Sequence, residues 1–215
     1  MYVIGLTGGI GSGKSTVSQM LAEKGAVVLS ADLVGHEVYL PGNPAWQEVV
    51  DAFGREVLAA DSNIDRQKLG AIVFADEAAL RRLNGITHPR MKELMREKLA
   101  QQEAAGTRVV VLEAALLFDA GWDDLADEVW VTVAPPELAA RRTAGRSGLN
   151  LEEALARVRA QMSNEERVRR SDVVIDTDCP LNDTRRQVDE AWERLAGRLK
   201  PSSGPAGSPP SRSSV

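Results

Sequence analysis

The residues with the clearest chemical signature follow the first apolar segment of the chain. The stretch Gly8-Gly9-Ile10-Gly11-Ser12-Gly13-Lys14-Ser15-Thr16 fits the pattern G-x-x-x-x-G-K-[ST]. Its glycines let the backbone curl so that successive N–H groups point inward, and the helix that follows adds donors and partial positive charge. Such a loop binds the phosphates of a nucleoside triphosphate. The alternative, an ordinary glycine-rich turn with a capping serine, is disfavoured because the whole pattern stands between a predicted strand and a predicted helix.

Each polar group of this loop has an expected role. Lys14 is expected to reach the β- and γ-phosphates, and Ser15 to offer its hydroxyl to a Mg²⁺ ion that bridges them. Thr16 can hydrogen-bond the α-phosphate, and Ser15 is the predicted metal ligand. The predicted phosphate-binding residues are Gly8, Gly9, Gly11, Ser12, Gly13, Lys14, Ser15 and Thr16.

A second candidate for chemistry is Asp32, which ends the next strongly apolar segment. Open α/β folds bind their ligands at the carboxyl edge of the sheet, so Asp32 is expected to face the phosphate loop. A carboxylate there can accept the proton of an attacking hydroxyl and hold that hydroxyl in line with the γ-phosphate. Position alone also allows a role as the N-cap of the following helix.

The elements that must position these residues are short apolar strands alternating with amphipathic helices, which predicts an α/β fold with a parallel sheet. The predicted strands are Val3 to Leu6, Val27 to Leu29, Arg108 to Leu112, Val129 to Val133 and Val173 to Ile175. The predicted helices are Lys14 to Lys24, Ala45 to Phe53, Arg66 to Phe74, Glu77 to Asn84, Pro89 to Ala104, Pro136 to Ala144, Leu151 to Glu166 and Leu181 to Leu199.

We interpret residues 1–200 as one domain with two additions to its core. The core comprises about residues 1–32, 106–140 and 171–200, a helical insertion spans about 33–105, and a lid spans about 141–170. The insertion is placed to cover a substrate. Residues 201–215 are dense in Pro, Ser and Gly and have almost nothing apolar to bury, which predicts a disordered tail.

Composition excludes several classes of protein. Lys and Arg total 26 against 31 Asp and Glu, and this net charge of -5 argues against a surface built to bind nucleic acid. No apolar run is long enough to cross a membrane. Cys179 is the single cysteine, so an intramolecular disulfide is impossible and a reducing cytoplasm is expected.

Arginines are concentrated in the predicted lid although the chain is acidic overall. Arg142 and Arg146 lie one helical turn apart, just before a flexible Ser147-Gly148-Leu149-Asn150 stretch. Guanidinium groups match phosphate geometry and stabilise charge on a transferring phosphoryl group, so these two are predicted to clamp the nucleotide. For most of the other lid arginines, including Arg157, Arg159, Arg169 and Arg170, solvated ion pairs with nearby glutamates are the simpler explanation.

In these positions the chain resembles the dephospho-coenzyme A kinase family, to about residue 195. The resemblance rests on segments whose order and spacing agree throughout. They are Ile4 to Ser15, Ala31-Asp32, Asp65-Arg66, Leu83-Asn84, Thr87-His88-Pro89, Leu116-Leu117-Phe118, Arg142, Arg146, Gln161 and Asp172 to Asp176.

The resemblance implies a P-loop kinase that transfers the γ-phosphate of ATP to the ribose 3′-hydroxyl of dephospho-CoA, the last step of coenzyme A synthesis. It implies Asp32 as the base, and the chemistry of the loop and of the lid arginines adds Lys14 and Arg142 as further catalytic residues. It also implies an acceptor site that includes Asp32, His36, His88 and Leu116. ATP and dephospho-CoA are the expected partners, Mg²⁺ the expected cofactor and a monomer or small homo-oligomer the expected assembly, with no nucleic acid and no membrane as partner.

His88 precedes Pro89, which predicts an extended His88 at the start of a new helix. A purely structural role for this histidine is the alternative. The sequence departs from the family pattern at several positions, among them Glu113 and Thr177. Glu113 stands where the family often has an aspartate, and its longer side chain is expected to hold a metal-bound water. Thr177 stands where an asparagine is common.

Other functions share part of this signature. A GTPase switch would need an Asn-Lys-x-Asp segment, and the sequence has none. A kinase for another small acceptor, such as a nucleoside monophosphate, would share every feature of the ATP site. A nonenzymatic nucleotide-dependent scaffold would bind ATP without needing the carboxylate of Asp32.

Overall fold

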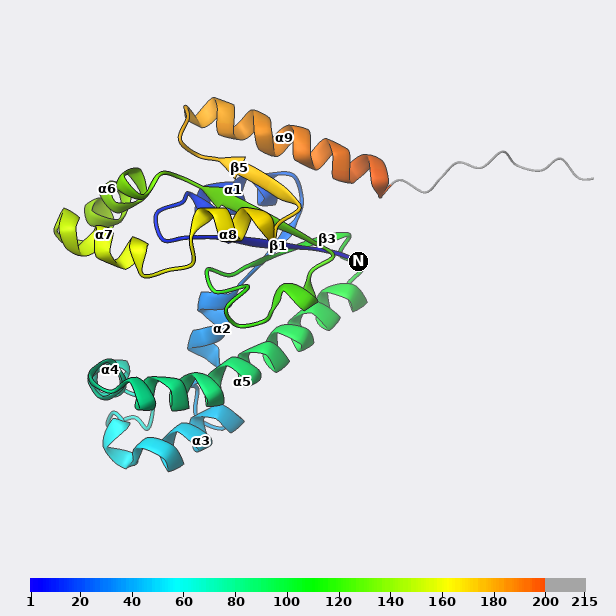
Figure 1. The fold of residues 1–215 in the computed structure, drawn as a ribbon. Coiled ribbons are helices and arrows are strands. Elements are labelled where there is room, and N and C mark those ends of the chain that lie inside the picture. The colour runs from blue at the N-terminus through cyan, green and yellow to red at the C-terminus, as the bar shows by residue number, and fades with distance from the viewer. Residues whose placement is uncertain (200–215) are drawn as a thin grey trace, which may run out of the picture.

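A five-stranded parallel sheet forms the centre of the protein in the computed structural model, which describes residues 1–199 (Figure 1). The strand order is β2-β3-β1-β4-β5, so the strand that leads into the phosphate loop is central. All five predicted strands are present, with bounds β1 Tyr2–Gly8, β2 Val27–Ser30, β3 Val109–Glu113, β4 Glu128–Val133 and β5 Val173–Asp176. Runs of Val, Ile and Leu form these strands because both faces of the sheet are covered.

Successive strand residues enter two different cores, one on each face of the sheet. Ile4 and Val111 pack with helices α1 (Lys14–Glu23) and α9 (Leu181–Arg198). Val3 and Val110 pack on the opposite face with α2 (Ala31–Glu37) and the second half of α5 (Glu77–Ala104). Each fully buried aliphatic side chain in these layers contributes about 1.5–3 kcal/mol to folding, so the sheet is a rigid base for the loops at its carboxyl edge.

The predicted insertion is a group of helices with a small core of its own. It contains α2, α3 (Pro44–Phe53), a short 3-10 turn (Arg55–Val57), α4 (Arg66–Ala75) and α5. Asp65 begins α4 by accepting hydrogen bonds from the two N–H groups of Gln67 and Lys68. The core residues are Val49, Val57, Ile64, Leu69, Val73 and Leu83. Figure 1 shows α3 and α4 beside the start of α5, away from the sheet.

The prediction of two helices around His88 was wrong. Residues 77–104 form one helix, α5, and both His88 and Pro89 lie inside it. Proline removes one helical hydrogen bond and disfavours helical geometry before it, but these effects are local. The proline ring of Pro89 crowds the residue four positions before it, which is Gly85. A side chain at Gly85 would meet only open space, so other elements do not crowd this turn of α5. Packing of α5 against the sheet and against the small core outweighs the local preference.

The predicted lid contains α6 (Pro136–Ser147), α7 (Leu151–Arg159) and α8 (Asn164–Arg169), so the single helix predicted from Leu151 to Glu166 is two helices. Asn150 and Glu153 form a capping box at the start of α7. Ser163 caps α8 by accepting a hydrogen bond from the Glu166 N–H, which marks a new helix start.

The exact domain boundaries stay predictions, and the tail predicted at residues 201–215 lies outside the described residues. Within residues 1–199, every helix is too short or too polar to span a bilayer.

Candidate active site

The phosphate loop connects the end of β1 to the start of α1. Gly11 and Gly13 adopt φ angles of 75° and 84°, which side chains with a Cβ rarely adopt. Gly13 is the N-cap of α1, so Lys14, Ser15 and Thr16 form the first turn of the helix, and the Gly13 carbonyl accepts from the Thr16 N–H at 3.0 Å. The Ser12 and Thr132 hydroxyls, 2.7 Å apart, hydrogen-bond and attach the loop to β4. The loop is therefore preformed to bind an anion.

A carboxylate faces the loop from the adjacent strand. Glu113 ends β3, which lies between β1 and β2, and its Oε1 is 3.8 Å from Lys14 Nζ. Both side chains are largely buried, at 17% and 15% exposed. The pairing directs the ammonium group of Lys14 across the carboxyl edge of the sheet.

Asp32 lies in the first turn of α2, where the sequence predicted the end of a strand. Ser30, which precedes this helix, occupies the N-cap position that was the alternative role of Asp32. The Asp32 side chain is exposed and borders a small hollow of about 80 Å³. His88 from α5 and Leu116 from the segment after β3 border the same hollow. The structure thus brings three of the four predicted acceptor residues together.

The fourth predicted acceptor residue, His36, lies one helical turn along α2 from Asp32, outside the residues that border the hollow. Arg66 donates a hydrogen bond of 2.7 Å to its imidazole and lies over the ring of Tyr39. His36 therefore contacts α4, within the helical insertion. Its role in binding the acceptor stays a prediction.

On the other side of the loop, a cleft of about 540 Å³ opens between α6 and the start of α9. Arg142 and Arg146 line it, together with Gly13, Thr16 and Thr177. The two Nη atoms of Arg142 donate to the hydroxyl and the carbonyl of Thr177, at 2.9 and 2.8 Å. Arg142 is thereby fixed over the loop, and the Thr177 hydroxyl donates in turn to the Ser12 carbonyl at 3.0 Å.

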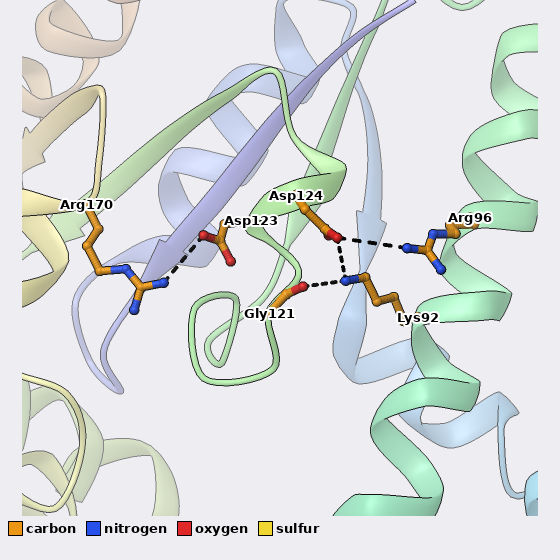
Figure 2. Close-up of polar contacts among 6 residues, drawn as sticks. All are labelled: Lys92, Arg96, Gly121, Asp123, Asp124 and Arg170. Atoms are coloured by element: carbon orange, nitrogen blue, oxygen red, sulfur yellow. Dashed lines mark hydrogen bonds and ion pairs between the residues drawn. The ribbon is translucent and has the colours of Figure 1, made fainter.

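The segment between β3 and β4 is tied to elements on two sides, as Figure 2 shows. Lys92 from α5 donates to the Gly121 carbonyl and pairs with Asp124 at 2.7 Å. Arg170, after α8, pairs with Asp123 at 3.4 Å and lies over the ring of Phe118. This segment, which carries the predicted acceptor residue Leu116, thus connects α5 to the end of α8.

Burial and a nearby charge act in opposite directions on His88. Burial lowers the pKa of the His88 imidazole, and the negative charge of Asp119 raises it by a smaller amount. The net effect is a lowered pKa, so the neutral form of His88 is favoured in the folded protein.

Two residues at the loop were absent from the predicted site. Gln161 accepts a hydrogen bond from the Ile10 N–H at 2.8 Å, and the Arg167 guanidinium lies beside Gly9. Gln161 belonged to the recognised segments, so its position carried a signal. Arg167 was one arginine among many, and sequence spacing gives no means of telling which of them turns inward.

A parallel sheet with this loop after its central strand, a nucleotide-sized cleft on one side and a carboxylate-lined hollow on the other defines a P-loop kinase. Residues 2–183 match the family model described as dephospho-CoA kinase. The chain therefore belongs to the dephospho-CoA kinase family, an ATP-using kinase family.

Individual relatives agree with this assignment. The chain is 46% identical over 186 residues to dephospho-CoA kinase of Carboxydothermus hydrogenoformans, covering 86% of this chain and 90% of that protein. It is 44% identical over 210 residues to dephospho-CoA kinase of Moorella thermoacetica, covering 97% and 99%. Among solved structures, dephospho-CoA kinase from Campylobacter jejuni superimposes with a TM-score of 0.70 and 27% identity, covering 92% of this chain and 98% of that chain.

Proposed function

We propose that this protein transfers the γ-phosphoryl group of ATP to the ribose 3′-hydroxyl of dephospho-CoA, giving coenzyme A and ADP. The family assignment supports the choice of substrates. The observation that carries the mechanism is the arrangement of one sheet edge, where the phosphate loop, the Lys14–Glu113 pair and the hollow beside Asp32 follow one another along β1, β3 and β2. Donor and acceptor can then meet without any large movement of the sheet.

In this proposal the cleft near Arg142 holds the nucleoside of ATP, and the triphosphate runs along the loop toward Lys14. N–H groups of the loop and of the first turn of α1, together with the Lys14 ammonium, bind the phosphates. Arg142 and Arg146 add positive charge from the lid. Because guanidinium groups keep their charge and offer several donors, they can follow the phosphate oxygens as charge builds up on them.

Asp32 acts on the acceptor. Its carboxylate accepts the proton of the attacking 3′-hydroxyl and aims the oxygen at the γ-phosphorus. His88 and Leu116 border the same hollow and position the acceptor, with His36 at its outer side as a further predicted contact.

The residues present fit a Mg²⁺ ion. Mg²⁺ prefers oxygen ligands, keeps several waters and binds chiefly through substrate phosphates with one or two protein groups. The exposed hydroxyl of Ser15 and the nearby carboxylate of Glu113 provide such oxygens. We propose Ser15 as a direct ligand and Glu113 as a holder of metal-bound water, and the ion, when bound, neutralises charge on the β- and γ-phosphates.

The test is Asp32→Asn, with Asp51→Asn as a matched control. Asp51 is an exposed aspartate on α3 whose visible contact is with Gln47, so its loss should leave turnover unchanged. Removing a catalytic base is expected to lower kcat by about 10²- to 10⁴-fold. ADP affinity, measured by calorimetry, should change little because Asp32 lies outside the nucleotide cleft. Wild-type turnover by Asp32→Asn would remove this residue from its proposed role.

Acceptor choice is tested by release of ADP with dephospho-CoA, nucleoside monophosphates and pantetheine compounds, each with ATP and Mg²⁺. Turnover with dephospho-CoA alone is expected, and turnover with a nucleoside monophosphate alone would contradict the proposed acceptor. A cytoplasmic location and a monomer or small homo-oligomer stay predictions.

A further inference from the structure

Arg167 is a buried charged residue with unfilled hydrogen-bonding capacity. It is 3% exposed, whereas the other arginines at the end of the lid, Arg169 and Arg170, are exposed. Its Nη1 donates to the Met162 carbonyl. Its Nη2 is buried and has no partner among the described residues. A guanidinium buried in this way is costly unless a further acceptor completes its hydrogen bonds.

The Nη1 end of this guanidinium lies beside the phosphate loop. A Cβ placed on Gly9 would lie 3.2 Å from Arg167 Nη1 and 3.2 Å from the Gln161 side-chain oxygen. The glycine at this position therefore lets the loop backbone and the arginine approach closely. The same close approach would bring an anion held by the loop within reach of the guanidinium.

The charge of Arg167 persists although the side chain is buried. Burial lowers the pKa of its guanidinium, and the negative charge of Asp119 opposes that effect. Asp119 also acts on His88, which borders the acceptor hollow. Arginine keeps its charge in proteins despite such shifts. A permanent positive charge thus lies beside the first residues of the loop.

The geometry points to Arg167 as a further catalytic residue, one that binds the γ-phosphoryl oxygens of ATP through its guanidinium, whose Nη1 lies beside Gly9. This inference rests on the proposed kinase reaction. The nucleoside cleft is lined by Gly11, Gly13 and Thr16, so the triphosphate enters the loop from its helical end. Gly9, at the opposite end of the loop, then lies nearest the terminal phosphate. The guanidinium donates hydrogen bonds and exchanges no proton, and it stabilises the charge that spreads over the transferring group.

Neighbouring contacts hold Arg167 in this position. Ser163 caps α8, and Ser171 donates to the Arg167 carbonyl at 2.7 Å. Arg170 anchors the end of α8 through its ion pair with Asp123, drawn in Figure 2, and through its contact with the Phe118 ring. Arg170 thereby fixes the end of the helix that carries Arg167.

The experiment compares Arg167→Gln and Arg167→Lys with Arg169→Gln, a control on the same helix. Arg169 is 74% exposed and pairs only with Glu166 in the described residues. For Arg167→Gln we expect kcat to fall about 10²- to 10³-fold, as when one donor to a developing charge is removed. Affinity for the imido analogue of ATP should fall about 10- to 100-fold, the effect of one charged hydrogen bond. ADP affinity should stay the same, because ADP lacks the γ-phosphate.

Each outcome decides the question. Arg167→Lys keeps the charge but loses the planar fork, so an intermediate kcat with normal ADP affinity supports the inference even if Arg167→Gln fails to fold. If both variants lose thermal stability but keep the wild-type kcat and the wild-type preference for the ATP analogue over ADP, Arg167 is structural and the inference is overturned. Failure of the unmodified enzyme to phosphorylate dephospho-CoA would instead overturn the proposed function.

Discussion

The hydroxyl of Thr177 joins the lid arginine to the phosphate loop. It accepts a hydrogen bond from Arg142 Nη1 at 2.9 Å and lies within hydrogen-bonding distance of the Ser12 and Val133 carbonyls, at 3.0 and 3.1 Å. Thr177 is 5% exposed, so water does not readily replace these partners. One hydroxyl thus aligns Arg142 and steadies the middle of the loop, which predicts that its removal weakens nucleotide binding.

Thr177→Val removes the hydroxyl and keeps the shape of the side chain. The Val133 carbonyl retains the Thr177 N–H as a donor, and Arg142 retains its bond of 2.8 Å to the Thr177 carbonyl. The Ser12 carbonyl and Arg142 Nη1 each lose a partner. An ordinary hydrogen bond contributes about 0.5–1.5 kcal/mol, and Arg142 can turn its free donor to water in the cleft, so we expect a total loss of about 1–2 kcal/mol.

That loss corresponds to about a 5- to 30-fold change in an equilibrium constant. We expect the loss in the free protein as a melting temperature lower by about 2–8 °C, and the misalignment of Arg142 as a rise of up to this factor in the Kd for ADP by calorimetry and in the KM for ATP. Thr177→Ser keeps the hydroxyl and should bind ADP like the wild type. Thr107→Val is the matched control, because Thr107 lies at the opposite edge of the sheet and its hydroxyl donates to Gln102. Wild-type ADP affinity in Thr177→Val would refute this reasoning.

Three further predictions concern other parts of the site. ATP should slow the modification of Cys179 by a chromogenic disulfide reagent, because this thiol lines the proposed nucleoside cleft; an unchanged rate would place the nucleoside elsewhere. Lys92→Met should raise the KM for dephospho-CoA several-fold and leave the KM for ATP unchanged, because it frees the segment carrying Leu116 from α5. Arg96→Gln is the control, because it removes only an exposed ion pair of 3.9 Å. Burial lowers the pKa of His88 from its ordinary 6.5, so the unfolded chain binds more protons than the folded protein near that pH. The free energy of unfolding, measured with urea, should therefore fall as the pH drops from 8 to 5. It should fall by less in His88→Gln.

Local pattern was sufficient to predict the strands and the phosphate loop. Strands buried on both faces need unbroken apolar runs, and a loop that wraps phosphate needs glycines at fixed spacing, so both leave a direct trace in the sequence. The order of the strands in the sheet left no such trace in the sequence. Only the structure shows that β3 separates β1 from β2, which places Glu113 between Lys14 and Asp32.

The errors arose where tertiary contacts decide the outcome. Local rules end a helix before Pro89, but the packing of α5 on two cores continues it. Helical periodicity extends from Leu151 to Glu166, but a serine cap at Ser163 begins a second helix. Arg167 shows the same limit for the site, because the burial of one arginine among several depends on where α8 meets the loop and the segment after β3.

The position of Arg167 also links lid closure to charge placement. The connection between α7 and α8 carries both Gln161, whose oxygen accepts from the Ile10 N–H, and the Met162 carbonyl that holds Arg167. Thr132 in β4 and Thr177 after β5 hold the loop through hydrogen bonds to Ser12. If the predicted lid moves in the proposed reaction, it would carry the Gln161 acceptor and the Arg167 guanidinium together relative to the loop. Water exclusion and charge stabilisation would then occur in one step, which would limit loss of the phosphoryl group to water before the acceptor is aligned.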